Sequence, residues 1–396
     1  MLLTLNLVSV FNGLLNISPS YTVTSSPDKV PIYSELLFEN LTQLDMMVYN
    51  MFRHSLYELM LKTKKRILII RCGRLGDTAV STVILNPLRH IFKDIEIDWV
   101  TKSEVADIFQ YEGDINPIRF NHTKIPLLLD IRKIRLIFRS FMKPYDAVFN
   151  LEVSKKYDYL VRLLRSSRKY GRPYNHIPDN RTEHRANHQM KIIDECGMRY
   201  PKEIAIPSLK CPERNVLTNI INDVGNYIVV SPSTSKFGKK NHRGYRDWPI
   251  QKWKKLIDIL YDNTNYQIVI TGTKNDYYKF LSTNKGRQDR VINLAGKLSI
   301  PEYLASLKYA KHVIGVDSAS IHIASAVGSE NIIAIFGPTS ISVSKPFETR
   351  SNQVKVISKK LSCSPCYATN IIKQCKDNVC MKSIEPREVL NIIRVR

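Results

Sequence analysis

The sequence is short of acidic residues and lacks the cysteine pattern of a secreted domain. Its 36 Asp and Glu stand against 59 Lys and Arg, which leaves a net charge of +23 over 396 residues. The seven cysteines are an odd number and only four are clustered, so a disulfide framework is a poor match and a reducing compartment is favoured. With 43% hydrophobic residues, the chain is nevertheless long and apolar enough for two globular domains.

Long hydrophobic runs are also scarce. The N-terminus is apolar, but no Lys or Arg precedes the run, and Asn6, Asn12 and Asn16 interrupt it, so it is a poor signal peptide. The run is shorter than the roughly 20 apolar residues that a transmembrane helix needs. We therefore expect a protein that is not integral to a membrane. Repeats of roughly 20–50 residues are absent from the sequence as well, which argues against solenoids and propellers.

The common nucleotide-binding fingerprints are missing too. An apolar run at 66–71 is followed by Gly73, Gly76 and Asp77 in the order Gly-x-x-Gly-Asp, and neither G-x-G-x-x-G nor a P-loop motif occurs. A phosphate would have to be held in another way. The segment VDSASIHIASAVG at 316–328 predicts a strand running into a helix, whose N-terminus would attract an anion. The same residues are also typical of an ordinary helix cap.

What the sequence does contain is a regular alternation of buried strands and helices. Strands are predicted at 66–71, 95–100, 147–152, 227–232, 266–272, 312–317 and 331–337, and helices at 250–262, 300–310 and 319–327. A further helix begins at Asp77 as its N-cap, and Pro87 is expected to kink or split it. The alternation predicts an α/β protein with parallel sheets, whose ligands bind at the carboxyl ends of the strands. We predict an N-terminal extension at 1–64 and domains at 65–210 and 211–396.

Several motifs together resemble glycosyltransferase family 9, the ADP-heptose:lipopolysaccharide heptosyltransferases and their relatives. They are ILIIRCGRLGDTAVST, YIVVSPSTSKFGKKNHRGYRDWPIQKW, NLAGKLSIPEYLASL, VDSASIHIASAVG, IFGPTS and the cysteine-rich C-terminal segment. The resemblance implies a GT-B fold, with two Rossmann-like doubly wound lobes facing a cleft. The N-terminal lobe would hold the acceptor and the C-terminal lobe the nucleotide-sugar donor. It also implies inverting transfer of a heptose or related sugar from an ADP-activated donor, without a catalytic metal, to a lipopolysaccharide-core, glycan or protein hydroxyl.

The resemblance assigns roles to individual residues. Asp77 matches the catalytic base, although the sequence alone equally allows a helix cap, with Asp98 and Glu152 as the next candidates. The matches to the donor site are Ser233, Thr234, Arg246, Asp276, Asp317, Ser318 and His322, with Lys239 and Lys240 as substitutes for Arg246. By sequence alone, His322 is equally well a packed core histidine.

The sequence departs from the family pattern at three places. Ala319 stands where the family has glycine and could crowd the phosphates, because alanine lacks glycine's freedom at positive φ. Val83 stands where proline is common, and KFGKKNHRGY is an insertion before Arg246. Ala319 leaves open a catalytically inactive protein that only binds a nucleotide sugar.

Four cysteines near the C-terminus have the spacing C-x2-C-x8-C-x4-C. Cys363, Cys366, Cys375 and Cys380 could hold zinc or iron through thiolate sulfur. Reduced thiols or two local disulfides are the alternatives. The resemblance favours the metal, because similar segments occur in some family members and some protein-directed relatives bind iron there.

The strong positive charge allows several partners. Nucleic-acid binding is one alternative, but the basic residues are spread along the chain and no nucleic-acid-binding motif occurs. An anionic membrane surface or a phosphorylated glycolipid would suit the charge equally well. We expect a cytoplasmic protein that binds peripherally to the inner face of the cytoplasmic membrane.

Overall fold

The computed structural model describes most of the chain from residue 64 onward. The described residues are 64–120, 130–174, 183–197, 199–232, 234, 244–280, 286–287, 289–349, 352–367 and 369–394. The predicted N-terminal extension lies outside them, except for Lys64. No helix within these ranges is both long and apolar enough to cross a bilayer.

The first sheet has five parallel strands in the order β3-β2-β1-β4-β5. The strands are β1 (Lys65–Ile70), β2 (Ile95–Lys102), β3 (Ile115–Phe120), β4 (Tyr145–Asn150) and β5 (Ser166–Gly171). In β1, the sequence KRILII is apolar at consecutive positions because both faces of the sheet are covered. The strand order reverses between β1 and β4, which makes the carboxyl ends of these two strands a switch point where ligands bind in such folds.

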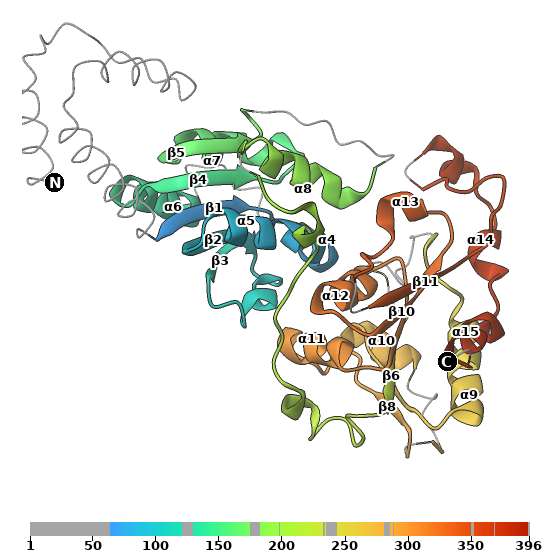
Figure 1. Ribbon diagram of the computed structural model, residues 1–396. Coiled ribbons are helices and arrows are strands. Elements are labelled where there is room, and N and C mark those ends of the chain that lie inside the picture. The colour runs from blue at the N-terminus through green and yellow to red at the C-terminus, as the bar shows by residue number, and fades with distance from the viewer. Residues whose placement is uncertain are drawn as a thin grey trace, which may run out of the picture. The chain divides into compact units, whose positions relative to one another are not determined.

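Helices cover both faces of this sheet (Figure 1). Ile67 and Ile69 pack with α4 (Leu75–Ser81), η2 (Thr82–Ile84), α5 (Leu85–Ile91) and α8 (Arg185–Asp194). On the opposite face, Leu68 and Ile70 pack with α6 (Ile131–Met142) and α7 (Asp158–Leu163). The alternation of side chains along one strand therefore supplies both halves of the core.

The second sheet has six parallel strands in the order β11-β10-β9-β6-β7-β8. They are β6 (Tyr227–Ser231), β7 (Gln267–Ile270), β8 (Val291–Asn293), β9 (His312–Val316), β10 (Asn331–Phe336) and β11 (Gln353–Ser358). Numbered within this sheet alone, the order is 6-5-4-1-2-3, which is the Rossmann order read from the other edge. The switch point lies between β6 and β9, and the residues that follow these strands meet there.

The helices of the second sheet again form two layers. One face packs with α9 (Ile250–Asn263) and α15 (Pro386–Arg394), and the other with α11 (Ile300–Lys308) and α12 (Ala319–Val327). The shorter helices are α10 (Lys274–Lys279), α13 (Ile341–Ser344) and α14 (Val379–Lys382). The α12 layer shares one hydrophobic cluster with the α4 and α8 layer of the first sheet, so the two sheets are joined by packed side chains.

The fold confirms the α/β class and the predicted strands, and it corrects one detail of the first helix. The helical region is split at η2, as Pro87 predicts, and the proline falls in the first turn of α5, where no backbone N–H is needed. Asp77 is not the N-cap, however. Arg74 takes that position, and Asp77 is the third residue of α4. The predicted boundary at residue 210 stays a prediction.

Candidate active site

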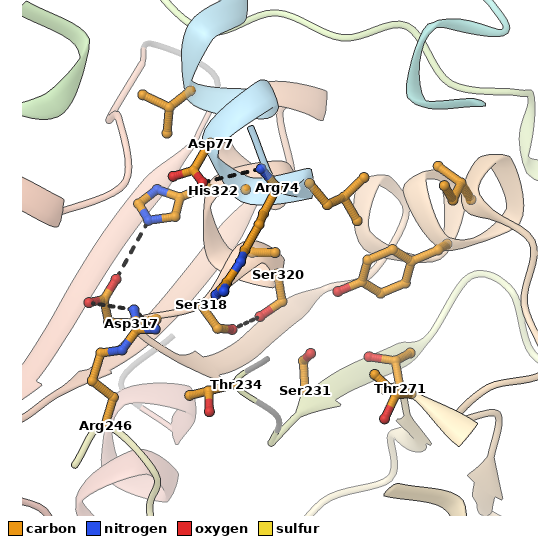
Figure 2. Close-up of a pocket in the computed structure, with 18 of the residues that line it drawn as sticks. Arg74, Asp77, Ser231, Thr234, Arg246, Thr271, Asp317, Ser318, Ser320 and His322 are labelled. Atoms are coloured by element: carbon orange, nitrogen blue, oxygen red, sulfur yellow. Dashed lines mark hydrogen bonds and ion pairs between the residues drawn. The ribbon is translucent and has the colours of Figure 1, made fainter. Parts of the chain in front are cut away.

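A cavity of about 500 Å³ lies where the loops after the strands of both sheets meet, a volume typical of small-molecule sites. Figure 2 shows its polar side chains. The first lobe contributes Arg74 to Asp77 and Arg185, and the second contributes Ser231, Thr234, Arg246, Thr271, Asp317, Ser318, Ser320 and His322. The cavity thus combines residues from both switch points.

The N-terminus of α12 forms one wall of this cavity. Ser318 is the N-cap residue with an extended backbone, and no side chain of the described part of the protein caps the helix. Its hydroxyl instead lies 2.9 Å from that of Ser320. The N–H groups of the first turn are therefore available to an anion, and the helix dipole favours negative charge there.

Ala319 does not disturb this helix start. It is the first residue of α12 and has a right-handed helical backbone, so the position does not require glycine's positive φ. Glycine's conformational freedom is therefore not needed at this position, and the crowding of a bound phosphate by the Ala319 methyl group stays a prediction.

Asp317 is a buried carboxylate that lies between the side chains of Arg246 and His322. One oxygen lies 3.3 Å from Nη1 of Arg246, which also donates to the backbone carbonyl of Asp317 at 2.8 Å. The other oxygen lies 3.6 Å from Nε2 of His322. Burial alone would raise the pKa of Asp317, but the hydrogen bond from His322 and the charges of His322, Arg246 and Arg185 lower it to about 2. The residue is ionised at neutral pH.

Arg246 is also placed by an aromatic neighbour. Its guanidinium lies 5.2 Å from the ring centre of Tyr367, and both side chains line the cavity. This distance is within the range of a cation–π contact. Asp317 and Tyr367 together hold the guanidinium of Arg246 close to the N-terminus of α12.

Asp77 reaches the same cavity from the first lobe. One oxygen of its carboxylate accepts a hydrogen bond of 3.2 Å from the backbone N–H of Arg74, and the other lies 3.8 Å from Nη1 of Arg185. The side chain is about one-third exposed. Its carboxylate is therefore oriented by two partners and open to a ligand.

The remaining predicted donor residues divide into three groups. Thr234 lines the cavity and donates to Asp247 at 2.5 Å. Asp276 does not line it, because its buried carboxylate accepts from the N–H and hydroxyl of Thr273 at the start of α10. Ser233, Lys239 and Lys240 lie outside the described residues.

The two reserve candidates for a base have structural partners. Asp98 is buried inside β2, not at a strand end, and bonds to Arg66 at 2.8 Å and Tyr145 at 2.6 Å. Glu152 accepts from the backbone N–H of Cys72 at 2.6 Å. Neither lines the cavity.

Several cavity residues were not expected from the sequence. Arg74 lies inside the recognised Gly-x-x-Gly-Asp motif, so its place beside the site could have been inferred. Arg185 and Tyr367 carry no such local signal. Tyr303 from α11 also lines the cavity, and burial raises the pKa of its phenol while hydrogen bonds with Ser231, Ser320 and Thr271 oppose the rise.

The four C-terminal cysteines line a separate cavity of about 90 Å³. None of the seven cysteines, which all lie among the described residues, forms a disulfide, so the disulfide alternative is not supported. Burial and the neighbouring thiols raise the pKa of Cys380 to about 11. Among the described residues, no three His, Cys, Asp or Glu side chains stand close enough together to hold a metal ion. The cluster therefore has suitable donor atoms without a coordinating arrangement.

Two doubly wound lobes with a cavity at the ends of their strands form the GT-B architecture. A family model described as glycosyltransferase family 9 (heptosyltransferase) matches residues 142–376. Because this match spans more than half of the sequence, the chain belongs to glycosyltransferase family 9 and is a glycosyltransferase.

Individual relatives agree with this family. Lipopolysaccharide heptosyltransferase 1 of Escherichia coli O18:K1:H7 is 24% identical over 292 residues, which cover 69% of this chain and 86% of the relative. The structure of E. coli heptosyltransferase WaaC with ADP has a TM-score of 0.62 at 20% identity, over 83% of this chain and 99% of that one. The iron-containing dodecameric glycosyltransferase TibC from enterotoxigenic E. coli H10407 has a TM-score of 0.51 at 12% identity, over 84% and 76% of the two chains.

The lowered pKa of Asp317 predicts that the protein loses a specific part of its stability in acid. Its pKa is below the ordinary value, so its contribution is complete above about pH 4 and disappears as the pH falls toward 2. Asp317→Asn should lower the free energy of unfolding at pH 7 by roughly 2 kcal/mol, and the difference from wild type should shrink across that window. Urea unfolding at several pH values measures this.

Asp107→Asn is the matched control for this prediction. Asp107 pairs with Arg119 on the surface, where both side chains are about half exposed. Its variant should follow the wild-type pH profile. A difference between wild type and Asp317→Asn that stays constant from pH 5 to about pH 2 would contradict the assignment.

Proposed function

We propose that this glycosyltransferase transfers a heptose from an ADP-activated donor to a hydroxyl of a lipopolysaccharide core. The observation that carries the proposal is the meeting of Asp77 and the uncapped α12 N-terminus in one cavity. Relatives named lipopolysaccharide heptosyltransferase, and the ADP in the WaaC structure, support the choice of sugar, nucleotide and acceptor.

The second lobe would hold the diphosphate of the donor. The first-turn N–H groups of α12, the hydroxyl of Ser318 and the guanidinium of Arg246 face the cavity from neighbouring positions. They would bind the two phosphates and stabilise the negative charge that grows on the leaving group. Asp317 offsets part of the Arg246 charge, so Arg246 serves mainly as an oriented donor of hydrogen bonds.

The first lobe would supply the base. Asp77 takes the proton of the acceptor hydroxyl as the oxygen forms a bond to the anomeric carbon. The bond between that carbon and the diphosphate oxygen breaks, and its electron pair leaves with ADP. Attack from the face opposite ADP inverts the anomeric configuration. Arg185, 3.8 Å from the Asp77 carboxylate, helps to keep the base oriented.

The reaction is tested with defined donors and acceptors. The purified full chain is incubated with ADP-heptose, or with a UDP- or GDP-activated hexose, and with a lipopolysaccharide core that lacks its heptose. Mass spectrometry should find one heptose added only from ADP-heptose. Transfer from a UDP- or GDP-sugar alone would overturn the donor, and transfer to a protein or free glycan alone would overturn the acceptor.

Asp77→Asn separates a catalytic base from a structural residue. Asparagine keeps an oxygen that accepts from the Arg74 N–H but cannot take a proton. The variant should bind ADP normally, melt within a few degrees of wild type and transfer sugar at least about a hundredfold more slowly, equivalent to about 2.7 kcal/mol. Single-turnover kinetics and calorimetry with ADP make the measurement.

The surface variant Asp107→Asn is the control here as well, and it should transfer sugar at the wild-type rate. If Asp77→Asn keeps more than about a third of the wild-type single-turnover rate, the residue is not the base. The cavity would then need another proton acceptor on the first lobe.

We also propose that the four cysteines, which do not form a coordinating arrangement in this structure, draw together to hold a structural zinc or iron ion. Their side chains share one cavity, and thiolate sulfur suits both metals. The iron in the TibC glycosyltransferase supports iron. The ion would take the place of the thiol protons and fix the segment that carries Tyr367, whose ring lies beside Arg246.

Elemental analysis of protein purified under reducing conditions tests the metal. About one equivalent of zinc or iron is expected, and Cys363→Ser with Cys380→Ser should remove it and lower the melting temperature. Cys211→Ser is the control, because Cys211 lies far from the cluster in sequence and does not line its cavity. Less than about a tenth of an equivalent of any transition metal, with activity intact, removes the idea.

A further inference from the structure

Helix α6 carries three different rows of side chains. Lys133, Leu136 and Ser140 are buried against the first sheet. The opposite side is apolar and exposed, with exposed fractions of 57% at Ile131, 38% at Ile134, 65% at Phe138, 54% at Phe141 and 74% at Met142. Successive members of each row are one to four residues apart, so each row follows one side of the helix.

The third row is cationic and lies next to the exposed apolar row. Its members, Arg132, Arg135, Arg139 and Lys143, are spaced three or four residues apart and all are exposed. Lys143 lies 3.8 Å from Glu96. The ion pairs of the described residues include none made by Arg132, Arg135 or Arg139. Among the described residues, these three exposed charges thus have no ion-pair partner.

The neighbouring helix extends this surface. Helix α7 packs on the same face of the first sheet as α6, as Figure 1 shows. Tyr159 is 74% exposed and Leu163 is 47% exposed on α7. Arg162 and Arg165 are exposed beside them. An aromatic, an aliphatic and further cationic side chains thus continue the pattern of α6.

We propose that the α6–α7 face is a docking surface for an anionic lipid bilayer. Exposed Phe, Ile and Met side chains beside a row of arginines match the interface of a membrane, where apolar groups enter the acyl boundary and cations contact phosphate headgroups. The helix lies flat on the bilayer, because its buried row holds it to the sheet. A nucleic acid would use the arginines but leave the apolar row in water, so the two rows together favour lipid.

Vesicle binding tests this docking surface with the full chain. Sucrose-loaded vesicles of phosphatidylethanolamine and phosphatidylglycerol should pellet the protein at low salt, and phosphatidylcholine vesicles should pellet much less. Phe138→Ser with Phe141→Ser should weaken binding to the anionic vesicles at least about tenfold. Replacing Arg132, Arg135 and Arg139 together with Gln should weaken binding to the anionic vesicles on the order of a hundredfold. This variant should also lose most of the salt dependence of vesicle binding.

Matched variants on the second lobe control for general effects. Tyr278→Ser with Ile371→Ser removes two equally exposed apolar side chains, and Gln at Lys255, Lys311 and Lys360 removes three exposed charges. Both should bind like wild type, and every variant should melt near the wild-type temperature.

Three outcomes would overturn the proposal. Binding that the α6 variants do not weaken would move the contact to another part of the chain, such as residues 1–63. Equal weakening by Gln at Lys255, Lys311 and Lys360 would show that total charge alone attracts the vesicles. A stable dimer that Phe138→Ser with Phe141→Ser dissociates, without any vesicle binding, would make the face a contact between two copies. The assay contains no nucleotide sugar, so its result is independent of the proposed transfer reaction.

Discussion

The candidate site depends on the close approach of α4 and α12 at Gly76 and Ala319. A Cβ atom at Gly76 would lie only 2.9 Å from the Cα atom of Ala319, nearer than two carbon atoms can pack. Asp77 is the third residue of α4, and Ser318 is the N-cap residue of α12. The absence of a side chain at position 76 therefore lets the carboxylate and the helix N-terminus line one cavity.

Charge around this contact is organised around one buried carboxylate. Asp317 holds Arg246 through both its side chain and its carbonyl, and it faces His322 on the other side. Removing a carboxylate from water is costly unless cations and hydrogen bonds replace the lost solvation. Here the guanidinium of Arg246 and the neighbouring His322 replace it, and in return the carboxylate fixes Arg246 beside the α12 N-terminus. Arg74 and Arg185 add positive charge from the other lobe, which suits a cavity for a diphosphate.

The sequence predicts the fold well where both faces of a strand are buried. β1, β6 and β10 are apolar at nearly every position and were all expected. β5, with the sequence SSRKYG, and β3, with INPIRF, were missed because they are edge strands of the first sheet, with exposed and half-buried positions. Helix α6 was missed for a related reason: its apolar residues point both into the core and into solvent, so a single apolar stripe does not appear.

Local sequence patterns identify the site residues that lie within motifs. They do not identify site residues that come together only through the tertiary structure. Asp77 and Ser318 follow glycine-bearing or small-residue turns after a strand, and both line the cavity. Asp98 also belongs to a strand, yet its partners Arg66 and Tyr145 come from β1 and β4 and enclose it. Arg185 reaches Asp77 from a helix more than a hundred residues later in the chain. No spacing rule along the sequence carries that information.

The proposed transfer reaction and the proposed membrane-docking surface assign consistent roles to the two lobes. The proposed base and the α6–α7 face both belong to the first lobe, on the two sides of one sheet. The proposed diphosphate site belongs to the second lobe, whose sheet has its own core on the face away from α12. A lipid-anchored acceptor held at the membrane would meet the first lobe, while a water-soluble nucleotide sugar would reach the second. The proposed transfer would take place beside the contact between Gly76 and Ala319, where groups from both lobes line one cavity.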